Sequence, residues 1–258
     1  MLNLSVKSIK DFQICERLFD YRHMEKLPEK IYARDINTEK FENTLKNIVY
    51  FFMFKKQSGV IPSYSAILNR WEKMWFPKNT NSYDIITEQH ETVYGNMASL
   101  TSKAANSLLL FYNHYSKSDL IPIAISEEYY LNTKNKSNIK DNFDIIFYAN
   151  KTFYVTKILF NYKNSQKDMY TTDFACLKQG FENRHPDKKL KTKYGFIDMM
   201  SQNIKFQEFH LTEDDITVFN DWCDKIDSTE IYMPKRGLIS YCKKCPFDKP
   251  CSKWKKDK

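Results

Sequence analysis

Three cysteines near the carboxyl end constrain this chain more than any other feature of its sequence. Cys242, Cys245 and Cys251 are separated by two and five residues, with Lys and Pro residues among those between them. A short loop with three thiols can wrap a metal centre, which then needs a fourth ligand from elsewhere in the chain. The candidates are the remaining cysteines, Cys15, Cys176 and Cys223. The spacing therefore predicts a metal site, and it does not separate zinc from an iron–sulfur cluster.

Composition limits the compartment and the partners that we expect. The chain has 258 residues, and its 40 Lys and Arg against 32 Asp and Glu give a formal charge of +8. This surplus favours a polyanionic partner such as nucleic acid. The two common glycine-rich phosphate loops are absent, and no apolar run approaches the ~20 residues of a membrane span. No secretion signal opens the chain, so we expect a cytoplasmic protein whose clustered cysteines bind metal rather than pair.

Hydrophobic periodicity predicts a helical first half followed by a mixed second half. Apolar residues at steps of three and four predict helices from a Ser8–Asp11 capping box, over 41–52, after Ser63 or Ser65, and over 93–115. After Pro122 the pattern predicts strands over 123–131, 142–149, 152–161, 194–200 and 204–211, and helices over 168–181 and from Thr212. We expect a helical region over 1–120, an α/β core over 121–230, and a Cys-rich loop with a basic tail over 231–258.

Both ends of the chain resemble a known family. Residues 5–21, with Cys15, are similar to the opening motif of the RecB-like branch of the PD-(D/E)XK nuclease superfamily, and residues 231–251 to its closing motif. The members with an iron–sulfur cluster are the most similar, among them the AddB nuclease domain, CRISPR-adaptation nucleases and many phage proteins. The resemblance implies an α/β restriction-endonuclease-like core, with a mixed central sheet flanked by helices.

The same resemblance implies a cofactor and a ligand set. Cys15, Cys242, Cys245 and Cys251 match the four cysteines that hold a structural [4Fe–4S] cluster in these relatives. Such a cluster would tie the first helix to the last loop. Zinc is the alternative metal, in which case the protein would be a zinc-stapled protein–protein adaptor.

The catalytic positions of the family are matched only in part. Nucleases of this superfamily bind Mg²⁺ or Mn²⁺ between two acids on adjacent strands, and a lysine follows the second acid. Asp144 matches the first acid and Lys163 the lysine, but Asn161 stands at the second acid position. Because a neutral amide is a poor ligand for a hard cation, we expect an impaired site. Activity would still be possible if Glu127 or Glu128 supplied the missing carboxylate, or if the match of these positions to the family were shifted along the sequence. It would also be possible if His23 folded back into the site.

Two helices of the family carry further site residues. Lys46 falls near the position where the family often has a histidine, and an inward-facing lysine would repel a metal ion. The positions of the family's Gln and Tyr on the later helix correspond to Tyr170 and Phe174.

Two basic segments suggest the partner. They supply the candidate phosphate contacts Lys188, Lys189, Lys191, Lys193, Lys243 and Lys244. The first segment, 188–193, is expected to be an exposed loop, and Tyr241, Phe247 and Trp254 near the second could stack on bases. We expect a DNA-binding pseudo-nuclease that acts on single strands or ends, as a subunit of a replication, recombination or transcription assembly. The alternatives are an active Mg²⁺- or Mn²⁺-dependent exonuclease and the zinc-stapled adaptor.

Overall fold

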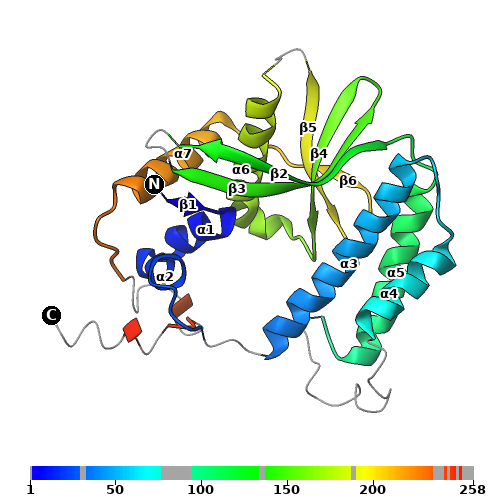
Figure 1. Ribbon diagram of the computed structural model, residues 1–258, viewed down its shortest axis with the longest axis horizontal. Helices are drawn as coiled ribbons and strands as arrows, with labels where there is room; N and C mark the ends of the chain where they lie inside the picture. The colour runs from blue at the N-terminus through cyan, green and yellow to red at the C-terminus, as the bar shows by residue number, and fades with distance from the viewer. Residues whose placement is uncertain are drawn as a thin grey trace.

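A mixed sheet runs through the centre of the molecule (Figure 1). The computed structural model describes residues 2–29, 33–76, 94–133, 137–186, 190–234, 241–242, 245–247 and 250–251. The strands are β1 Asn3–Leu4, β2 Ile121–Asn132, β3 Asn138–Ala149, β4 Thr152–Leu159, β5 Lys191–Asp198 and β6 Phe206–Glu208. The helices are α1 Val6–Ile14, α2 Glu16–Phe19, α3 Ala33–Gln57, α4 Tyr64–Trp75, α5 Met97–Tyr115, α6 Lys167–Arg184 and α7 Glu213–Ser228, with a π-helical turn Asp20–Met24 and a 3₁₀ turn Asn164–Gln166.

The sheet has the order β1-β3-β4-β5-β6, and β2 also pairs with β3. β1 is parallel to β3 and β4 to β5, while the other pairs are antiparallel. β3 and β4 form a hairpin whose turn residues Asn150 and Lys151 both have positive φ, as a tight two-residue hairpin turn requires. α6 connects the parallel strands β4 and β5. The expected α/β class, with a mixed central sheet flanked by helices, is confirmed.

Each face of the sheet is covered by three of the helices. α1, α6 and α7 pack on one face with Phe143, Val155 and Phe196 from the strands. α3, α4 and α5 pack on the other with Ile145 and Ile158. Figure 1 shows this second group of helices together at one side, with α1 and α2 at the other. Among the helices that the structure describes, none is both long and apolar enough to cross a bilayer.

The first residues of the chain differ from the expectation of a purely helical start. β1 adds two residues to the sheet beside β3, and α1 begins directly after it. The cap of α1 is Ser5, whose hydroxyl accepts from the Ser8 backbone, so the predicted start at Ser8 was three residues late. The caps at Ser63 and Thr212 are confirmed, and Thr212 forms the expected reciprocal box with Asp215.

Most predicted segments have other bounds in the structure, and three of the differences matter for the site. β4 ends at Leu159, two residues before the predicted end, because the Asp198 carboxylate accepts from the backbone N–H groups of Asn161 and Tyr162 and turns the chain there. β6 covers only Phe206–Glu208 of the strand predicted over 204–211. The expected loop over 188–193 was wrong for its second half, because β5 already begins at Lys191 and pairs with β4.

Candidate functional site

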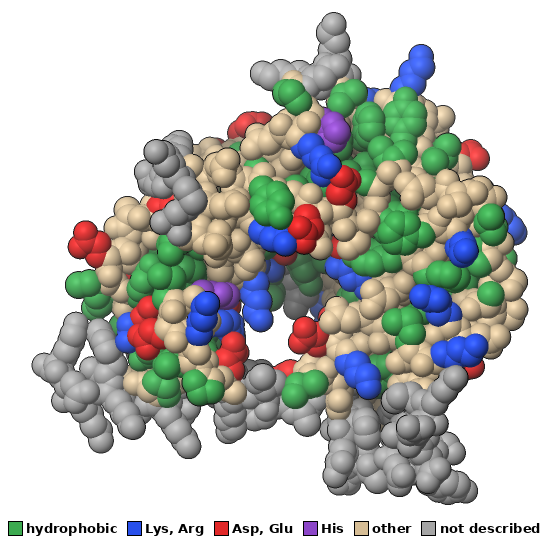
Figure 2. Space-filling model, in the orientation of Figure 1, with side chains coloured by type: hydrophobic (Ala, Val, Ile, Leu, Met, Phe, Trp, Pro, Cys, Tyr) green, Lys and Arg blue, Asp and Glu red, His purple; other side chains and the backbone are tan. Residues whose placement is uncertain are grey.

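An open cleft of about 540 Å³ lies where β3 is flanked by β1, β2 and β4. Its wall carries three acids and three lysines: Glu128, Asp141, Asp144, Lys46, Lys140 and Lys157. The amino-terminal residues 3–5, Ser8 and His23 complete it. Figure 2 shows this face hollowed between the N-terminal helices and α3, with both blue and red side chains along the hollow.

Asp144 is the most deeply buried acid of the cleft, with 2% of its surface exposed. One carboxylate oxygen accepts from the Tyr50 hydroxyl at 2.6 Å and lies 2.7 Å from the Lys46 ammonium. The other oxygen accepts from the backbone N–H of Ile158 at 2.7 Å. Burial, and then the charge of Asp144, raises the pKa of Tyr50, so this hydroxyl stays a donor. Both oxygens of the predicted first acid are therefore engaged by the protein itself.

The second acid of the cleft, Asp141, belongs to a buried polar layer. Lys157 on β4 lies 2.6 Å from its carboxylate and also donates to the carbonyl of Asn142. Burial alone would lower the pKa of Lys157, but the nearby Asp141 and Asp144 carboxylates outweigh it and raise this pKa. The Tyr129 hydroxyl donates to Asp141 from β2 at 3.2 Å. Lys157 is therefore a charged partner for the acid and is unavailable as a base.

The rim of the cleft repeats this pairing of acid with base. Glu128, the candidate replacement carboxylate, lines the cleft and pairs with Lys140 at 2.6 Å. Its neighbour Glu127 pairs instead with Arg184 at the end of α6. His23 lines the cleft from the π-helical turn, but its Nε2 lies 2.7 Å from a carboxylate oxygen of Asp11. Each of the three acids on the wall thus has its own lysine.

The predicted residues Asn161 and Lys163 do not join this cleft. Both follow the end of β4, and Asn161 has a φ of 61° in the turn that Asp198 holds. Lys163 directly precedes the 3₁₀ turn. Because Ile145 pairs with Thr156, the part of β4 beside Asp144 is Lys157 and Ile158. The structure therefore places a lysine, and not Asn161, beside the first acid.

The residues that match the family's site positions on helices lie partly in the cleft and partly in the core. Lys46 faces into the cleft and forms an ion pair with Asp144. Phe174 is fully buried and stacks on Phe209 at 4.1 Å between ring centroids, so it is a core residue. Tyr170 contacts Tyr162 at 5.3 Å. Sequence reasoning missed Lys157. It is the only charged residue of β4, which could have marked it, but only the register of the hairpin shows that it lies beside Asp144.

The cysteines from the two ends of the chain lie together. Cys15, Cys245 and Cys251 pack around Phe247, Leu18 and Tyr21 in one small apolar cluster. Burial raises the pKa of the Cys245 thiol, and the neighbouring Cys251, Cys15 and Cys242 raise it further. The other three predicted ligands therefore lie close enough to Cys245 to act on its charge.

The other two cysteines lie in the large core and not in this cluster. Cys176 and Cys223 are buried among the helices α6 and α7, and burial raises the pKa of Cys223 to about 12. In the described residues no three His, Cys, Asp or Glu side chains are placed to hold a single metal ion. A four-iron cluster is larger than one ion, because each cysteine binds its own iron. Three cysteines that lie near Cys245 suit that donor pattern.

The predicted basic contacts are only partly described. Lys188, Lys189, Lys243 and Lys244 lie outside the described residues, as does Trp254. Lys191 is exposed at the start of β5, and Lys193 pairs with Glu208 at 2.6 Å. Phe247 is 1% exposed, so the expectation that its ring stacks on a base was wrong.

The overall arrangement is similar to one solved structure in particular. It is that of a protein from Eubacterium rectale named a “putative exonuclease”. The match covers 94% of this chain and 87% of that chain, with a TM-score of 0.52 and 11% sequence identity. At this identity the likeness concerns the fold alone. No family model matches the sequence, and no curated protein is similar to it.

Proposed function

We propose that this chain is a DNA-binding, nuclease-like protein whose cleft does not carry out metal-dependent cleavage. The observation that carries the proposal is the one-to-one pairing of Asp144, Asp141 and Glu128 with Lys46, Lys157 and Lys140. A divalent cation needs several carboxylate oxygens, and here it would have to displace an ammonium group from each. In this proposal the protein is a subunit of a DNA-processing assembly.

The test is a nuclease assay with Mn²⁺ and, separately, Mg²⁺ on end-labelled single-stranded and duplex DNA. We expect DNA binding that weakens steeply with salt, as phosphate contacts require, and no cleavage above a metal-free control. Asp144→Ala is the matched variant. Cleavage that disappears in Asp144→Ala would overturn the proposal, because a contaminating nuclease would not respond to this change.

One observation favours an active exonuclease as the second candidate. Three acids and a lysine share a single cleft, and the phosphates of a bound strand compete for lysines. A substrate that drew Lys46 away would free an oxygen of Asp144 for Mg²⁺ or Mn²⁺. The same assay separates the two candidates, since this one requires cleavage only when DNA and metal are both present.

For the cysteine cluster we propose a structural [4Fe–4S] group held by Cys15, Cys242, Cys245 and Cys251. The convergence of both chain ends on Phe247 supports it, since a group there would join α1 to the closing loop. Anaerobic purification, followed by an absorption spectrum and iron, sulfide and zinc analysis, is the test. One zinc without iron would favour the adaptor alternative.

A further inference from the structure

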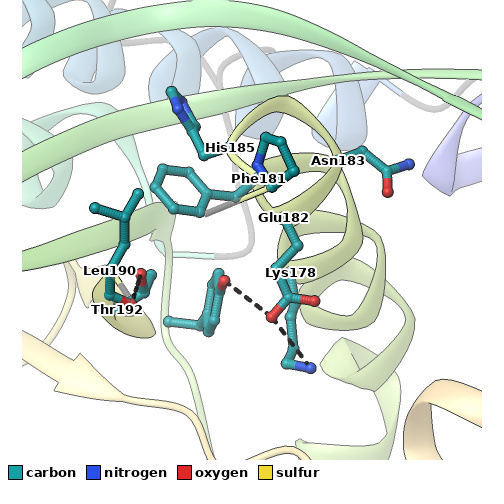
Figure 3. A pocket seen from close by; sticks show the side chains of 9 residues that line it. Lys178, Phe181, Glu182, Asn183, His185, Leu190 and Thr192 are labelled. Carbon is teal, nitrogen blue, oxygen red and sulfur yellow. Dashed lines mark hydrogen bonds and ion pairs between the residues drawn. The ribbon is translucent and has the colours of Figure 1, made fainter. Parts of the chain in front are cut away.

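A second pocket lies at the far end of α6, away from the cleft. It has a volume of about 520 Å³ and is bounded by the last turns of α6 and the first residues of β5 (Figure 3). It is lined by Lys178, Phe181, Glu182, Asn183, His185, Pro186, Leu190, Thr192 and Tyr194. Neither the family resemblance nor the proposed function assigns a role to it.

Aromatic rings form much of the pocket wall. Phe181 is 2% exposed, and its ring centroid lies 4.6 Å from that of His185 and 6.2 Å from that of Tyr194. Figure 3 shows the Phe181 ring with His185 above it and Leu190 to one side. A pocket lined by aromatic rings and aliphatic carbons suits a planar aromatic ligand, because such a ligand is stabilised by stacking on the rings.

The polar groups of the pocket suit the edge of a neutral ring better than a phosphate. Glu182 pairs with Lys178 at 3.3 Å, so their charges cancel. The Glu182 carboxylate also accepts from the Tyr194 hydroxyl at 3.4 Å. Burial, followed by the charge of Glu182, raises the pKa of Tyr194, so this hydroxyl stays neutral. Thr192 adds a hydroxyl on the β5 side. These groups offer a donor and acceptors without net charge.

The pocket is connected to the cleft by one residue. Arg184, within the same turn of α6 as Phe181, donates to the backbone carbonyl of Glu128 at 3.4 Å and pairs with Glu127. Glu128 is itself part of the cleft wall. Lys191 lies exposed on the β5 side of the pocket. Arg184 thus joins the pocket end of α6 to the strand that carries part of the cleft wall.

From this geometry we propose that the pocket binds an unpaired nucleobase of single-stranded DNA. The proposal rests on the proposed DNA-binding function and names the part of the strand that the protein recognises beyond the cleft. Stacking on His185 and Tyr194 would supply affinity, while Glu182 and Thr192 would bond the edge of the base. Stacking accepts every base, so little sequence preference is expected.

The experiment compares two oligonucleotides of equal length, one of deoxyadenylate and one abasic along its whole length, by fluorescence anisotropy. We expect roughly tenfold tighter binding of the strand that has bases, the size that one stacked base supplies. His185→Ala and Tyr194→Leu should each reduce this ratio several-fold. His210→Ala is the matched control, because His210 is also exposed and lies outside the pocket. Thermal melts check that each variant folds.

The outcomes separate the two proposals. Absence of binding to either strand would overturn the DNA-binding function itself. Equal binding to both strands would leave that function intact and overturn the nucleobase pocket. A preference for bases that survives in both His185→Ala and Tyr194→Leu would also overturn it, since the recognised base would then lie elsewhere.

Discussion

The cleft and the cysteine cluster are both places where the sequence resembles a metal site, and they balance charge in opposite ways. In the cleft, every acid of the wall faces a lysine, and Asp144 also accepts from Tyr50 and the Ile158 backbone. In the cluster, burial and then the nearby Cys251, Cys15 and Cys242 raise the pKa of Cys245.

This difference determines whether each region needs a bound metal ion to be stable. Acids that are paired within the protein need no metal ion to fold, and a cation must compete with a tethered ammonium to bind there. Thiols that gather together repel one another once ionised, and a bound metal removes that repulsion. Under the functions proposed above, the cleft would have lost its metal requirement while the cysteine cluster would have kept its own.

The largest effect is expected from breaking the cysteine cluster. Cys15→Ser should abolish iron and sulfide incorporation and should loosen both chain ends, because metal binding at such a site contributes about 10 kcal/mol or more to folding. Cys176→Ala is the control, since Cys176 lies in the core between α6 and the sheet. Metal analysis and thermal melts check this pair. Iron retained in Cys15→Ser would remove Cys15 from the ligand set.

The next effect concerns the pair between Lys157 and Asp141, whose lysine is the least exposed of the three in the cleft. Lys157→Met leaves Asp141 without its ammonium partner, and removal of one member of a buried pair costs about 3–5 kcal/mol. The double variant Lys157→Met with Asp141→Asn should recover part of that loss. Urea unfolding of the four proteins gives the coupling energy. A coupling near zero would mean that the pair does not stabilise the cleft.

These two regions also differ in how far sequence alone could define them. The cysteine spacing and the match around Cys15 predicted that the two ends of the chain meet, and Cys15, Cys245 and Cys251 do pack in one apolar cluster. The metal that they would hold stays a prediction. The hairpin of β3 and β4 was also predicted, since Asn150 and Lys151 separate two strongly apolar runs.

The cleft could not be assigned in the same way, because its pairs depend on register and on tertiary contacts. The strand end that excludes Asn161 is fixed by Asp198, which is 37 residues further along the chain. The partner of Asp144 comes from a helix 98 positions earlier, a separation that follows from the numbering of Lys46 and Asp144. Periodicity predicts which face of α3 is apolar, but not which strand residue lies opposite Lys46.

A smaller loss is expected at the pair between Lys46 and Asp144, whose lysine is more exposed than Lys157. The Lys46 side chain is 29% exposed, compared with 12% for Lys157, so solvent screens its pairing with Asp144. Lys46→Met should lower the free energy of unfolding by about 1–2 kcal/mol. Manganese titration calorimetry on the same variant tests the comparison directly. Mn²⁺ binding that appears only in Lys46→Met would show that the tethered ammonium excludes the metal.

The smallest effect is a pH dependence in the polar layer that lies behind the cleft. Burial raises the pKa of Asp173, and Lys10, at 2.7 Å, opposes that rise only in part. A carboxyl with a raised pKa in the folded state costs stability while ionised at neutral pH. That cost disappears as the pH falls through the raised pKa toward the ordinary value of 3.8. Relative to Asp173→Asn, the unmodified protein should therefore gain stability as the pH falls from 7 to 4.5. Urea unfolding at several pH values measures the gain, with Asp168→Asn on the exposed start of α6 as the control. A difference that stays constant with pH would show that Lys10 fully compensates the buried charge.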